Sequence, residues 1–436
     1  MAAPPPRTLV SPVGRDVAAG TQVADCNLRR LTERRPRILV LNQYYWPGIE
    51  ATAQLLAQLC EALARDYDVT VVTGQLRGHE LPSEESRNGV RILRVRSTTY
   101  DRAQLHLRAA NYGTYLGDTA LTALRGERPD LVLCMTDPPI IGDVALVVAR
   151  RFGVPLLVIS QDVFPEIAER VKRLEQPILL GALRRLVALY LKRADRVVAI
   201  GETMKDRLEA KGAPAARLAV IPNWVDTTEL TPMPRRNAWS AAHALDDAFV
   251  VMHSGNIGHA QDLDALIRAA TFLRDLGSLR IVVIGFGARH GEVTRLAQRL
   301  EVTVAVRFLG YQSRDVLPLS LASGDFHYVG LARGLSGFVV PSRLYGTLAA
   351  GRAVLVSADA DSETARLVEE VGCGIVVAPG RPELVAGVIR DVMEGRLSLE
   401  GMGERGREWA EREADREIAF GRYRSLVADV VASSSR

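Results

Sequence analysis

The chain has 436 residues, about two to three times the usual length of one domain, so we expect two domains rather than a single core. Its composition, with 47% hydrophobic, 24% charged and 6% aromatic residues, excludes a disordered, collagen-like or disulfide-framework protein. A formal net charge of +4, from 55 Lys and Arg against 51 Asp and Glu, is too small to indicate a nucleic-acid-binding protein.

Cysteine spacing and the distribution of apolar residues indicate the compartment. The four cysteines, Cys26, Cys60, Cys134 and Cys373, form no CxxC motif, so neither a zinc site nor a disulfide scaffold is expected. Residues 1–35 contain early prolines and no secretory apolar run, and we expect them to form a disordered extension. Charges interrupt every apolar stretch that could span a bilayer, so we expect a cytoplasmic protein without a transmembrane helix.

The first half of the chain alternates short apolar runs with segments of helical length. The runs are RILVLNQ, YDVTVVTG, PDLVLCM, VPLLVIS, ADRVVAI and ARLAVIP. Runs of this kind are typical of strands that are buried on both faces of a parallel sheet. The alternation therefore predicts a doubly wound α/β domain over residues 36–226.

The alternation stops after Asp226, in the Pro- and Arg-containing stretch TTELTPMPRRNAWS, and then starts again. The second series of runs is AFVVMHS, LRIVVIGFG, VAVRFLGY, DFHYVG, AVLVSAD and CGIVVAPG. It predicts a second doubly wound domain over residues 227–405. Residues 406–436 are polar and amphipathic with no further strand, which predicts a C-terminal helix that returns toward the first domain.

Loops that follow strands hold the ligands of open α/β sheets, because the carboxyl ends of the strands present helix N-termini and backbone N–H groups. The first such loop contains Gly48 and Glu50 but no GxGxxG, so a dinucleotide-dependent dehydrogenase is not indicated. Gly285 and Gly287 follow a strand without the acidic residue that such a site needs, and we interpret them as a structural turn.

Two loops of the second half favour a phosphate ligand. In SGNIGH, the glycines let the backbone approach an anion, while Asn256 and His259 could donate hydrogen bonds to it; a plain turn is the alternative. A later loop leads to Ser342, a candidate helix cap, and to Arg343 in the first helical turn. A cation there is unfavourable against the helix dipole unless an anion offsets it, so Arg343 indicates a bound diphosphate; the alternative is an Arg extended into solvent.

Six ordered motifs of the chain resemble family 4 glycosyltransferases. They are NQYYWPGIEATAQLLAQLCEAL, QDVFPEIAERV, GETMKDRL, VIPNWVD, HSGNIGHAQDLDALIRAA and GFVVPSRLYGTLAAGRAVLVSADADSETARLV. The resemblance extends from Arg37 to the end and is greatest to the branch that builds bacterial capsular, O-antigen and colanic-acid polysaccharides. It implies a GT-B fold, in which two Rossmann-like domains face each other across a cleft. It also implies a nucleotide-sugar donor on the C-terminal domain, an acceptor on the N-terminal domain, retention of configuration, and neither a metal nor another cofactor.

The resemblance also implies roles for individual residues. The loop containing Gly48 and Glu50 would approach the donor phosphate, and Asn256 and Gly258 would face it from the other domain. The diphosphate and ribose would be surrounded by Ser336, Gly337, Ser342 and Arg343.

The chain departs from the family pattern at its carboxylates. The usual Glu-x₇-Glu pair falls on Phe338 and Gly346, so both carboxylates are missing. Glu363 matches a Glu that often follows this motif and is a candidate to compensate for them. Many relatives have a His where this chain has Thr136 and Asp137.

On the acceptor side, the candidate catalytic groups are carboxylates. Asp137, and Asp162 with Glu166, follow separate strands and should converge at one edge of the first sheet. One of the two aspartates could orient or deprotonate an acceptor hydroxyl while Arg343 stabilises the leaving diphosphate. The alternative is that these aspartates only cap turns. Asp-x-Asp pairs are too common to indicate a metal site, and the one ending at Asp361 is better interpreted as a helix cap.

Residues 169–195 combine a leucine-rich apolar stripe with the cations Lys172, Arg173, Arg184, Arg185, Lys192 and Arg193. A basic amphipathic helix can lie on an anionic membrane surface, which would suit a lipid-linked acceptor; the alternative is that its apolar face belongs to the core.

We therefore predict a glycosyltransferase that moves a sugar from a nucleotide diphosphate sugar to a glycan or polyprenyl-linked acceptor. The alternatives are a non-hydrolysing nucleotide-sugar epimerase and a non-catalytic nucleotide-sugar- or glycan-binding protein, because the Glu pair is absent.

Overall fold

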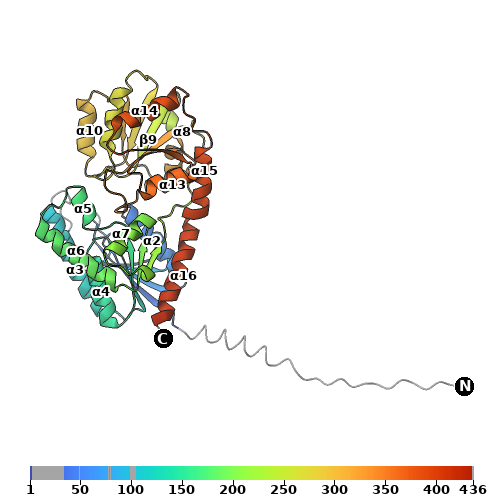
Figure 1. Ribbon diagram of the computed structural model, residues 1–436. Helices are drawn as coiled ribbons and strands as arrows, with labels where there is room; N and C mark the ends of the chain where they lie inside the picture. The colour runs from blue at the N-terminus through green and yellow to red at the C-terminus, as the bar shows by residue number, and fades with distance from the viewer. Residues whose placement is uncertain (2–33, 49, 77, 79, 99–104, 435–436) are drawn as a thin grey trace. The chain divides into compact units, whose positions relative to one another are not determined.

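The computed structural model describes residue 1 and residues 34–434, except positions 49, 77, 79 and 99–104. The expected extension over residues 1–35 and Cys26 therefore lie almost entirely outside the described residues. From Arg37 onward the chain forms one compact unit that contains two β-sheets, each covered by helices on both faces (Figure 1). This confirms the predicted pair of doubly wound α/β domains.

The N-terminal sheet has eight strands in the order β3-β4-β2-β1-β5-β6-β7-β8. Their bounds are β1 Arg37–Leu41, β2 Asp68–Gly74, β3 Glu84–Arg87, β4 Val90–Val95, β5 Leu131–Met135, β6 Leu156–Ser160, β7 Arg196–Ala199 and β8 Leu218–Val220. All neighbouring strands are parallel except β3 and β4, an antiparallel hairpin that our sequence analysis did not predict. Its two-residue turn is Asn88-Gly89, and both residues have positive φ, as such hairpin turns require.

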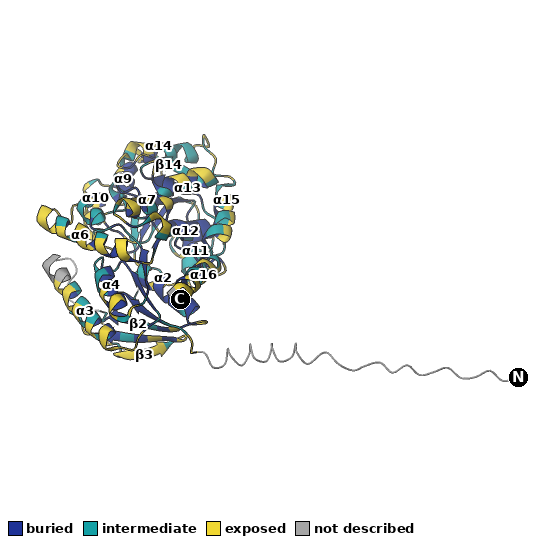
Figure 2. Ribbon diagram, turned by 60° about the horizontal axis from the view of Figure 1, so that its bottom comes forward, coloured by how far each residue is buried: buried dark blue, intermediate teal, exposed yellow. Residues whose placement is uncertain are grey.

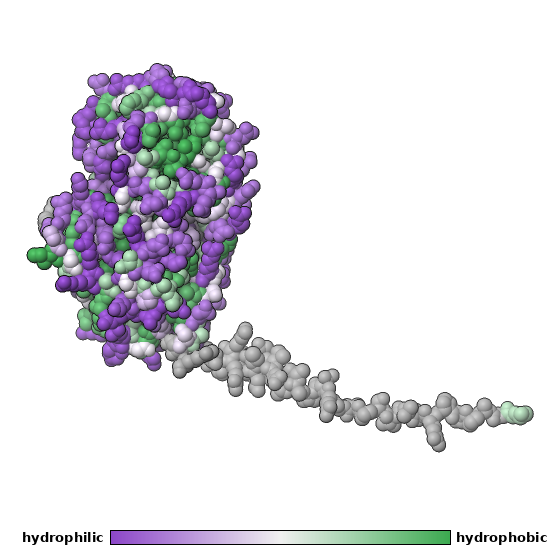
Figure 3. Space-filling model, in the orientation of Figure 1, coloured by the Kyte–Doolittle hydropathy of each residue, from purple (hydrophilic) through white to green (hydrophobic). Residues whose placement is uncertain are grey.

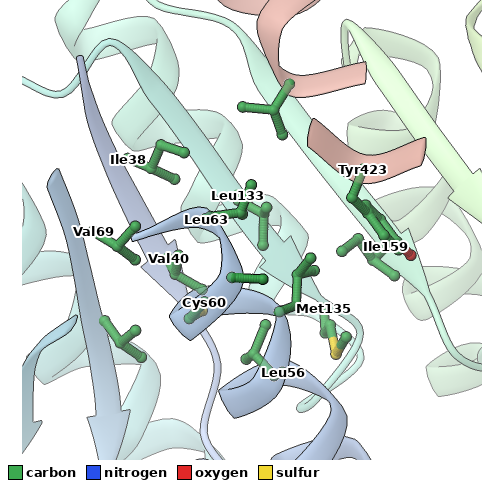
Figure 4. Close-up of a cluster of buried hydrophobic side chains, with 14 of the residues drawn as sticks. Ile38, Val40, Leu56, Cys60, Leu63, Val69, Leu133, Met135, Ile159 and Tyr423 are labelled. Atoms are coloured by element: carbon green, nitrogen blue, oxygen red, sulfur yellow. The ribbon is translucent and has the colours of Figure 1, made fainter. Parts of the chain in front are cut away.

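Helices cover the two faces of this sheet. They are α2 Ala51–Leu63, α3 Leu105–Arg125, α4 Ile141–Phe152, α5 Glu166–Arg170, α6 Pro177–Arg193 and α7 Glu202–Ala210. On one face, α2 packs its Leu56, Cys60 and Leu63 against the strand residues Ile38 and Val40 (Figure 4). On the other face, α3, α4 and α6 pack side by side with α4 in the middle. No helix in the described part of the chain is both long and apolar enough to cross a bilayer.

The C-terminal sheet has six parallel strands in the order β11-β10-β9-β12-β13-β14. The strands are β9 Phe249–Ser254, β10 Leu279–Ile284, β11 Val306–Leu309, β12 Phe326–Gly330, β13 Val354–Ser357 and β14 Gly374–Val377. The helices are α8 Ala238–Ala242, α9 Leu263–Ala269, α10 His290–Arg299, α11 Leu317–Ala322, α12 Arg343–Ala349, α13 Glu363–Val371, α14 Pro382–Met393 and α15 Met402–Trp409. Each of the six predicted apolar runs contains one of these strands.

The end of the chain returns to the N-terminal domain, as predicted. After a π-helical turn over Ala410–Ala414, helix α16 (Arg416–Ser434) packs on the first domain and contacts α2 (Figure 1). The rings of Phe420 and Tyr423 lie edge-on to Trp224, with centroids 5.5 and 5.7 Å away. The chain passes between the two domains twice, once after Val225 and once near Ala414, and these two segments lie side by side. The Val225 amide donates to the Ala414 carbonyl oxygen and the Arg416 amide donates to the Val225 carbonyl oxygen, both at 2.9 Å. The domain boundaries expected from the sequence, at 226/227 and 405/406, stay predictions.

Candidate active site

Asp137 lies at the carboxyl edge of the N-terminal sheet, directly beyond β5. The Thr52 hydroxyl, in the first turn of α2, donates to its Oδ2 at 3.4 Å. The Gln43 amide, from the loop after β1, donates to its carbonyl oxygen at 2.9 Å. Two loops therefore hold Asp137 beside the start of α2.

Asp162 lies at the same edge, beyond β6, and is connected to Asp137 through one residue. The buried Thr136 hydroxyl donates to Asp162 Oδ1 at 3.4 Å and accepts the Gln161 amide at 3.1 Å. Because Thr136 immediately precedes Asp137 in the chain, the hydrogen bond of Thr136 links the loop of Asp137 to Asp162. Glu166 is used differently, since both its oxygens accept from Lys211 Nζ, at 2.8 and 2.7 Å. The structure thus brings Asp137 and Asp162 to one edge and places Glu166 in an ion pair.

The end of β1 adds polar atoms that the protein itself leaves unused. Within the described residues, the buried oxygens Asn42 Oδ1 and Gln43 Oε1 have no hydrogen-bond partner. Buried polar atoms without a partner are rare and call for an explanation. Both side chains are buried, so these two oxygens lie beneath the surface of the N-terminal edge.

Gly48 and Glu50 occupy the loop before α2. The Gly48 amide already donates to the Tyr45 carbonyl oxygen at 2.8 Å. A Cβ at position 48 would lie 2.8 Å from that oxygen and 2.7 Å from Glu50 Oε2, so the loop requires glycine for packing. Glu50 stands at the N-cap position of α2 and makes no side-chain cap bond. The approach of this loop to a donor phosphate remains a proposal.

The carboxyl edge of the C-terminal sheet presents a cation. Arg343, the first residue of α12, places Nη1 2.9 Å from both ring nitrogens of the buried His253 near the end of β9. Its Nη2 lies 3.4 Å from the Asn256 carbonyl oxygen. Burial lowers the pKa of Arg343 to about 10, so the group is still charged at neutral pH. Burial, followed by the Arg343 charge, lowers the pKa of His253 well below its usual range, which leaves a neutral ring that can accept a hydrogen bond. Arg343 makes no ion pair with any described residue.

Two glycine loops support this arginine. The Gly255 position faces Arg343 Nε, and a Cβ there would lie 3.5 Å from it. A Cβ at Gly285, where φ is +123°, would collide with the Gly255 carbonyl oxygen, and the Gly255 amide donates to Ile284 at 2.9 Å. The Gly285 loop is therefore a structural turn, as predicted, and it brings the Gly255 backbone under Arg343.

The other predicted site residues of the SGNIGH loop differ in how far they are exposed to solvent. Asn256 and His259 are exposed, whereas Gly258 is buried and its amide donates to Gln261 Oε1 at 2.9 Å. Partial burial, followed by the charge of Arg173 from the N-terminal domain, lowers the pKa of His259. The side chains of Asn256 and His259 are thus accessible to solvent at an edge that lies near a positive charge of the facing domain.

The loop that contains Ser336 and Gly337 packs directly on the N-terminal domain. Ser336 is buried, and Gly337 has a φ of +77° with its Cα so close to Thr203 that a Cβ would lie 2.7 Å from the Thr203 carbonyl oxygen. Phe338, at the first missing Glu position, has its ring 4.6 Å from the guanidinium carbon of Arg170 and 4.8 Å from that of Arg207. Its carbonyl oxygen accepts the Val163 amide at 2.9 Å, one residue after Asp162. The two carboxyl edges therefore meet at this loop.

Glu363 also bridges the domains. Its Oε2 accepts from the Thr203 amide at 3.1 Å and from the Thr203 hydroxyl at 3.2 Å, at the start of α7. One oxygen of the predicted compensating carboxylate thus caps a helix of the other domain. Ser342 is exposed and makes no cap bond to α12, so the expected cap there is wrong. The cap before α13 is confirmed, because Ser362 Oγ accepts the Ala365 amide at 3.2 Å.

One Asp-x-Asp pair, Asp262 and Asp264, is held by partners within the C-terminal domain. Asp262 Oδ2 accepts from the Ser357 hydroxyl at 2.9 Å and from the Gly380 amide at 2.8 Å, and Asp264 pairs with Arg289 at 2.9 Å. Among the described residues, no group of three or more His, Cys, Asp and Glu side chains is placed to hold a metal ion.

Comparisons with known proteins identify the family. A Glycosyl transferase 4-like domain model matches residues 48–224, and a Glycosyl transferases group 1 model matches residues 235–409. The chain belongs to the group 1 (family 4) glycosyltransferases. Enzymes of this group use nucleotide-sugar donors.

This group 1 glycosyltransferase is similar to "Probable glycosyltransferase WbjE" of Pseudomonas aeruginosa, with 24% identity over 407 residues, 91% of this chain and 99% of the relative. It is also similar to "Putative colanic acid biosynthesis glycosyl transferase WcaI" of Escherichia coli K12, with 31% identity over 231 residues, 52% of this chain and 55% of the relative. Its fold matches the crystal structure of Anabaena Alr3699/HepE in complex with UDP-glucose, with a TM-score of 0.70, 15% identity, and coverage of 90% of this chain and 99% of that chain. The GT-B fold predicted from the sequence is thereby confirmed.

Several residues of this glycosyltransferase site escaped our sequence analysis. His253 carried a signal, since a polar residue inside the strand FVVMHS directly precedes a glycine loop. Arg170, Thr203 and Arg207 lie in the motifs QDVFPEIAERV and GETMKDRL, but nothing near them in the sequence predicted their contacts with the Gly337 and Glu363 segments, which join positions far apart in the chain.

Proposed function

We propose that this glycosyltransferase moves a sugar from a nucleotide diphosphate sugar to a glycan or polyprenyl-linked acceptor during synthesis of a bacterial surface polysaccharide. The name of WcaI, a colanic acid biosynthesis relative, supports the pathway. The observation that carries the reaction is that the two facing sheet edges carry opposite charges. Arg343 stands without an ion-pair partner among the described residues on one edge, and Asp137 and Asp162 stand on the other.

On the donor side, Arg343 takes the leaving group. Its guanidinium can make charge-assisted hydrogen bonds to the diphosphate, whose negative charge grows as the bond to the sugar breaks. His253 holds the guanidinium from behind, and the Gly255 backbone leaves room for a phosphate beside it. We propose that Arg343 neutralises the diphosphate in place of a metal ion.

On the acceptor side, Asp137 or Asp162 orients the hydroxyl and takes its proton. The acceptor oxygen forms a bond to the anomeric carbon, while the bond from that carbon to the diphosphate oxygen breaks and its electron pair leaves with the diphosphate. Retention requires the oxygen to arrive on the face that the diphosphate leaves, which the meeting of the two edges beside Asp162 and Phe338 favours.

We propose a cytoplasmic reaction. Cys60, Cys134 and Cys373 are buried free thiols, which suits a reducing compartment. A polyprenyl-linked acceptor would bring the protein to an anionic membrane surface.

The first test is calorimetric titration of the full chain with UDP, GDP, ADP and dTDP in buffer containing EDTA. We expect one nucleotide to bind with a micromolar Kd although EDTA removes free metal ions, because Arg343 takes the place of a metal ion at the diphosphate. The cognate nucleotide sugars are next incubated with polyprenyl-diphosphate-linked acceptors, and the products are analysed by mass spectrometry.

Three outcomes would overturn the proposal. A folded protein that binds no nucleotide, or that binds donor without transferring it to any acceptor, would favour a binding protein. An epimerised nucleotide sugar formed without acceptor would favour an epimerase.

A further inference from the structure

Helix α6 has an outer face that the N-terminal domain does not use. Its inner face supplies the core with Leu180, Val187, Tyr190 and Leu191. Four more large apolar side chains remain exposed to solvent: Ile178 at 90%, Leu179 at 45%, Leu186 at 41% and Leu189 at 40%. A surface helix normally presents polar residues opposite its buried stripe, so this helix departs from the rule.

The exposed apolar residues of α6 form one stripe. At 3.6 residues per turn, positions 178, 182, 186 and 189 lie within about 80° of one another around the helix. Position 182 is occupied by Ala182, which is exposed as well. Figure 2 colours much of α6 as exposed, and Figure 3 shows a hydrophobic protrusion on the side of the N-terminal domain where Figure 1 draws α5 and α6. We call the exposed residues Ile178, Leu179, Ala182, Leu186 and Leu189 the outer stripe.

Positive charge lies along the outer stripe. Arg185 and Lys192 are exposed on one flank of it, and Arg193 is exposed at the end of the helix. Helix α6 contains no acidic residue. Within the described residues, Arg184 is the one α6 cation in an ion pair, with Glu166 and Glu169. The outer face of α6 therefore has an apolar centre, flanked by positive charges that no acidic residue of the helix neutralises.

The outer stripe begins beside the acceptor edge of the site. Helix α6 follows β6 and α5 in the chain, and β6 ends just before Asp162. Its first turn, with Ile178 and Leu179, therefore starts from the carboxyl edge of the sheet, and the helix runs back across the face shared with α4. A surface that contacts the outer stripe would lie close to Asp162.

We propose that the outer stripe and its cations dock the protein on an anionic lipid bilayer. Ile178 and its apolar neighbours enter the boundary of the acyl chains, while Arg185, Lys192 and Arg193 contact headgroup phosphates. The proposal rests on the proposed function in one respect: docking would deliver a lipid-linked acceptor to the edge that carries Asp162. The absence of acidic residues on α6 favours an anionic bilayer over a second copy of this chain, whose outer stripe would bring like charges together.

The test is flotation of the full chain with vesicles of phosphatidylcholine alone and of phosphatidylcholine containing about a third phosphatidylglycerol. We expect binding to the anionic vesicles that weakens as salt is raised, because surface charges are screened. The double variant Ile178→Asp/Leu189→Asp should lose roughly tenfold or more in vesicle affinity, since the insertion of apolar area is removed. Arg185→Glu/Lys192→Glu should lose about tenfold or more on anionic vesicles only, from about 1 kcal/mol per cation.

Matched controls lie on the C-terminal domain. Val304 is 81% exposed there, so Val304→Asp introduces the same charge at an apolar surface position away from α6. Arg295→Glu/Arg299→Glu reverses two exposed cations on α10. Both controls should bind vesicles like the wild type.

The outcomes separate docking from catalysis. Nucleotide titration and transfer to a water-soluble acceptor analogue should be unchanged in the α6 variants, which also shows that they are folded. Failure of the wild type to bind anionic vesicles would overturn the proposal, as would α6 variants that bind like the wild type. A dimer that Ile178→Asp/Leu189→Asp dissociates in light scattering, without vesicle binding, would assign the stripe to a second copy instead.

Discussion

The carboxyl edges of the two sheets carry functional groups of opposite charge. The N-terminal edge carries Asp137 and Asp162, which accept from the hydroxyls of Thr52 and Thr136. The C-terminal edge carries Arg343 on glycine-rich backbone. Neither edge alone has the groups for both halves of the proposed sugar transfer, so the proposal places the reaction where the two edges meet.

The two edges also differ in what holds their functional groups. Side-chain hydroxyls and backbone amides position the aspartates, whereas close backbone approach at Gly255 and Gly285 and a neutral ring at His253 position the arginine. Substitutions at the N-terminal edge should therefore change the chemical step, and substitutions at the C-terminal edge should change binding of the diphosphate.

The largest effect is expected from the aspartates. Asp137→Asn or Asp162→Asn, whichever holds the acceptor hydroxyl, should lower kcat by roughly 10²- to 10⁴-fold, because an amide cannot take the proton. Nucleotide affinity measured by calorimetry should stay close to that of the wild type. Asp206→Asn, an exposed aspartate on α7, is the control. Full activity in both site variants would remove the carboxylates from the mechanism.

A smaller loss is expected at the other edge. Arg343→Ala should raise the Kd of the nucleoside diphosphate roughly 10- to 100-fold, the value of a charge-assisted hydrogen bond of about 1.5–3 kcal/mol. The Kd of the nucleoside should change little, and Arg366→Ala, an exposed arginine of α13, should behave like the wild type. An equal loss for nucleoside and nucleoside diphosphate would place Arg343 outside the diphosphate site.

The contact between Glu363 and Thr203 joins the two domains, and its loss should lower stability. Glu363→Ala removes the acceptor of the Thr203 amide and hydroxyl, at a cost of about 1 kcal/mol, as for other helix caps. Calorimetry should show a Tm lower by about 2–4 °C. Glu363→Gln, which can still accept, should recover part of this loss, and the exposed Glu369→Ala should show none. A Glu363→Ala protein with unchanged Tm would mean that the cap contributes nothing.

Two buried histidines of the C-terminal domain should contribute to the pH dependence of stability. Burial lowers the pKa of His327 to about 4 and that of His253 well below its usual range. The unfolded chain then binds more protons than the folded one below about pH 6.5, so the free energy of unfolding falls on acidification, by up to about 1.4 kcal/mol per pH unit for each ring. Burial raises the pKa of Asp143 to about 7, which adds a slope of opposite sign in the same range. Urea unfolding between about pH 7 and pH 4.5 therefore measures the net slope, and His327→Gln should remove the contribution of its ring. An unchanged slope in the variant would exclude His327 as a source.

The strand-helix alternation was predictable because strands buried on both faces leave continuous apolar runs that need no partner to be recognised. β3 was missed because its sequence EESR is polar, and the Asn88-Gly89 turn was its one local signal. Asp137 and Asp162 were found as site candidates because strand ends converge on one edge, and Arg343 because a cation in the first turn of a helix calls for an anion. The Thr203 contact with Glu363 was not predictable, since it joins residues 160 positions apart.

The core of the first domain includes residues from the end of the chain. Helix α16 buries Phe420, Tyr423 and Val427 in the same cluster as Leu56, on α2, and Trp224 (Figure 4). During synthesis on the ribosome, the first domain emerges long before the helix that completes its core. The apolar face that α16 covers therefore stays exposed, or is bound by a chaperone, until the C-terminal domain has been synthesised. The N-terminal domain is thus made first but completes its core last.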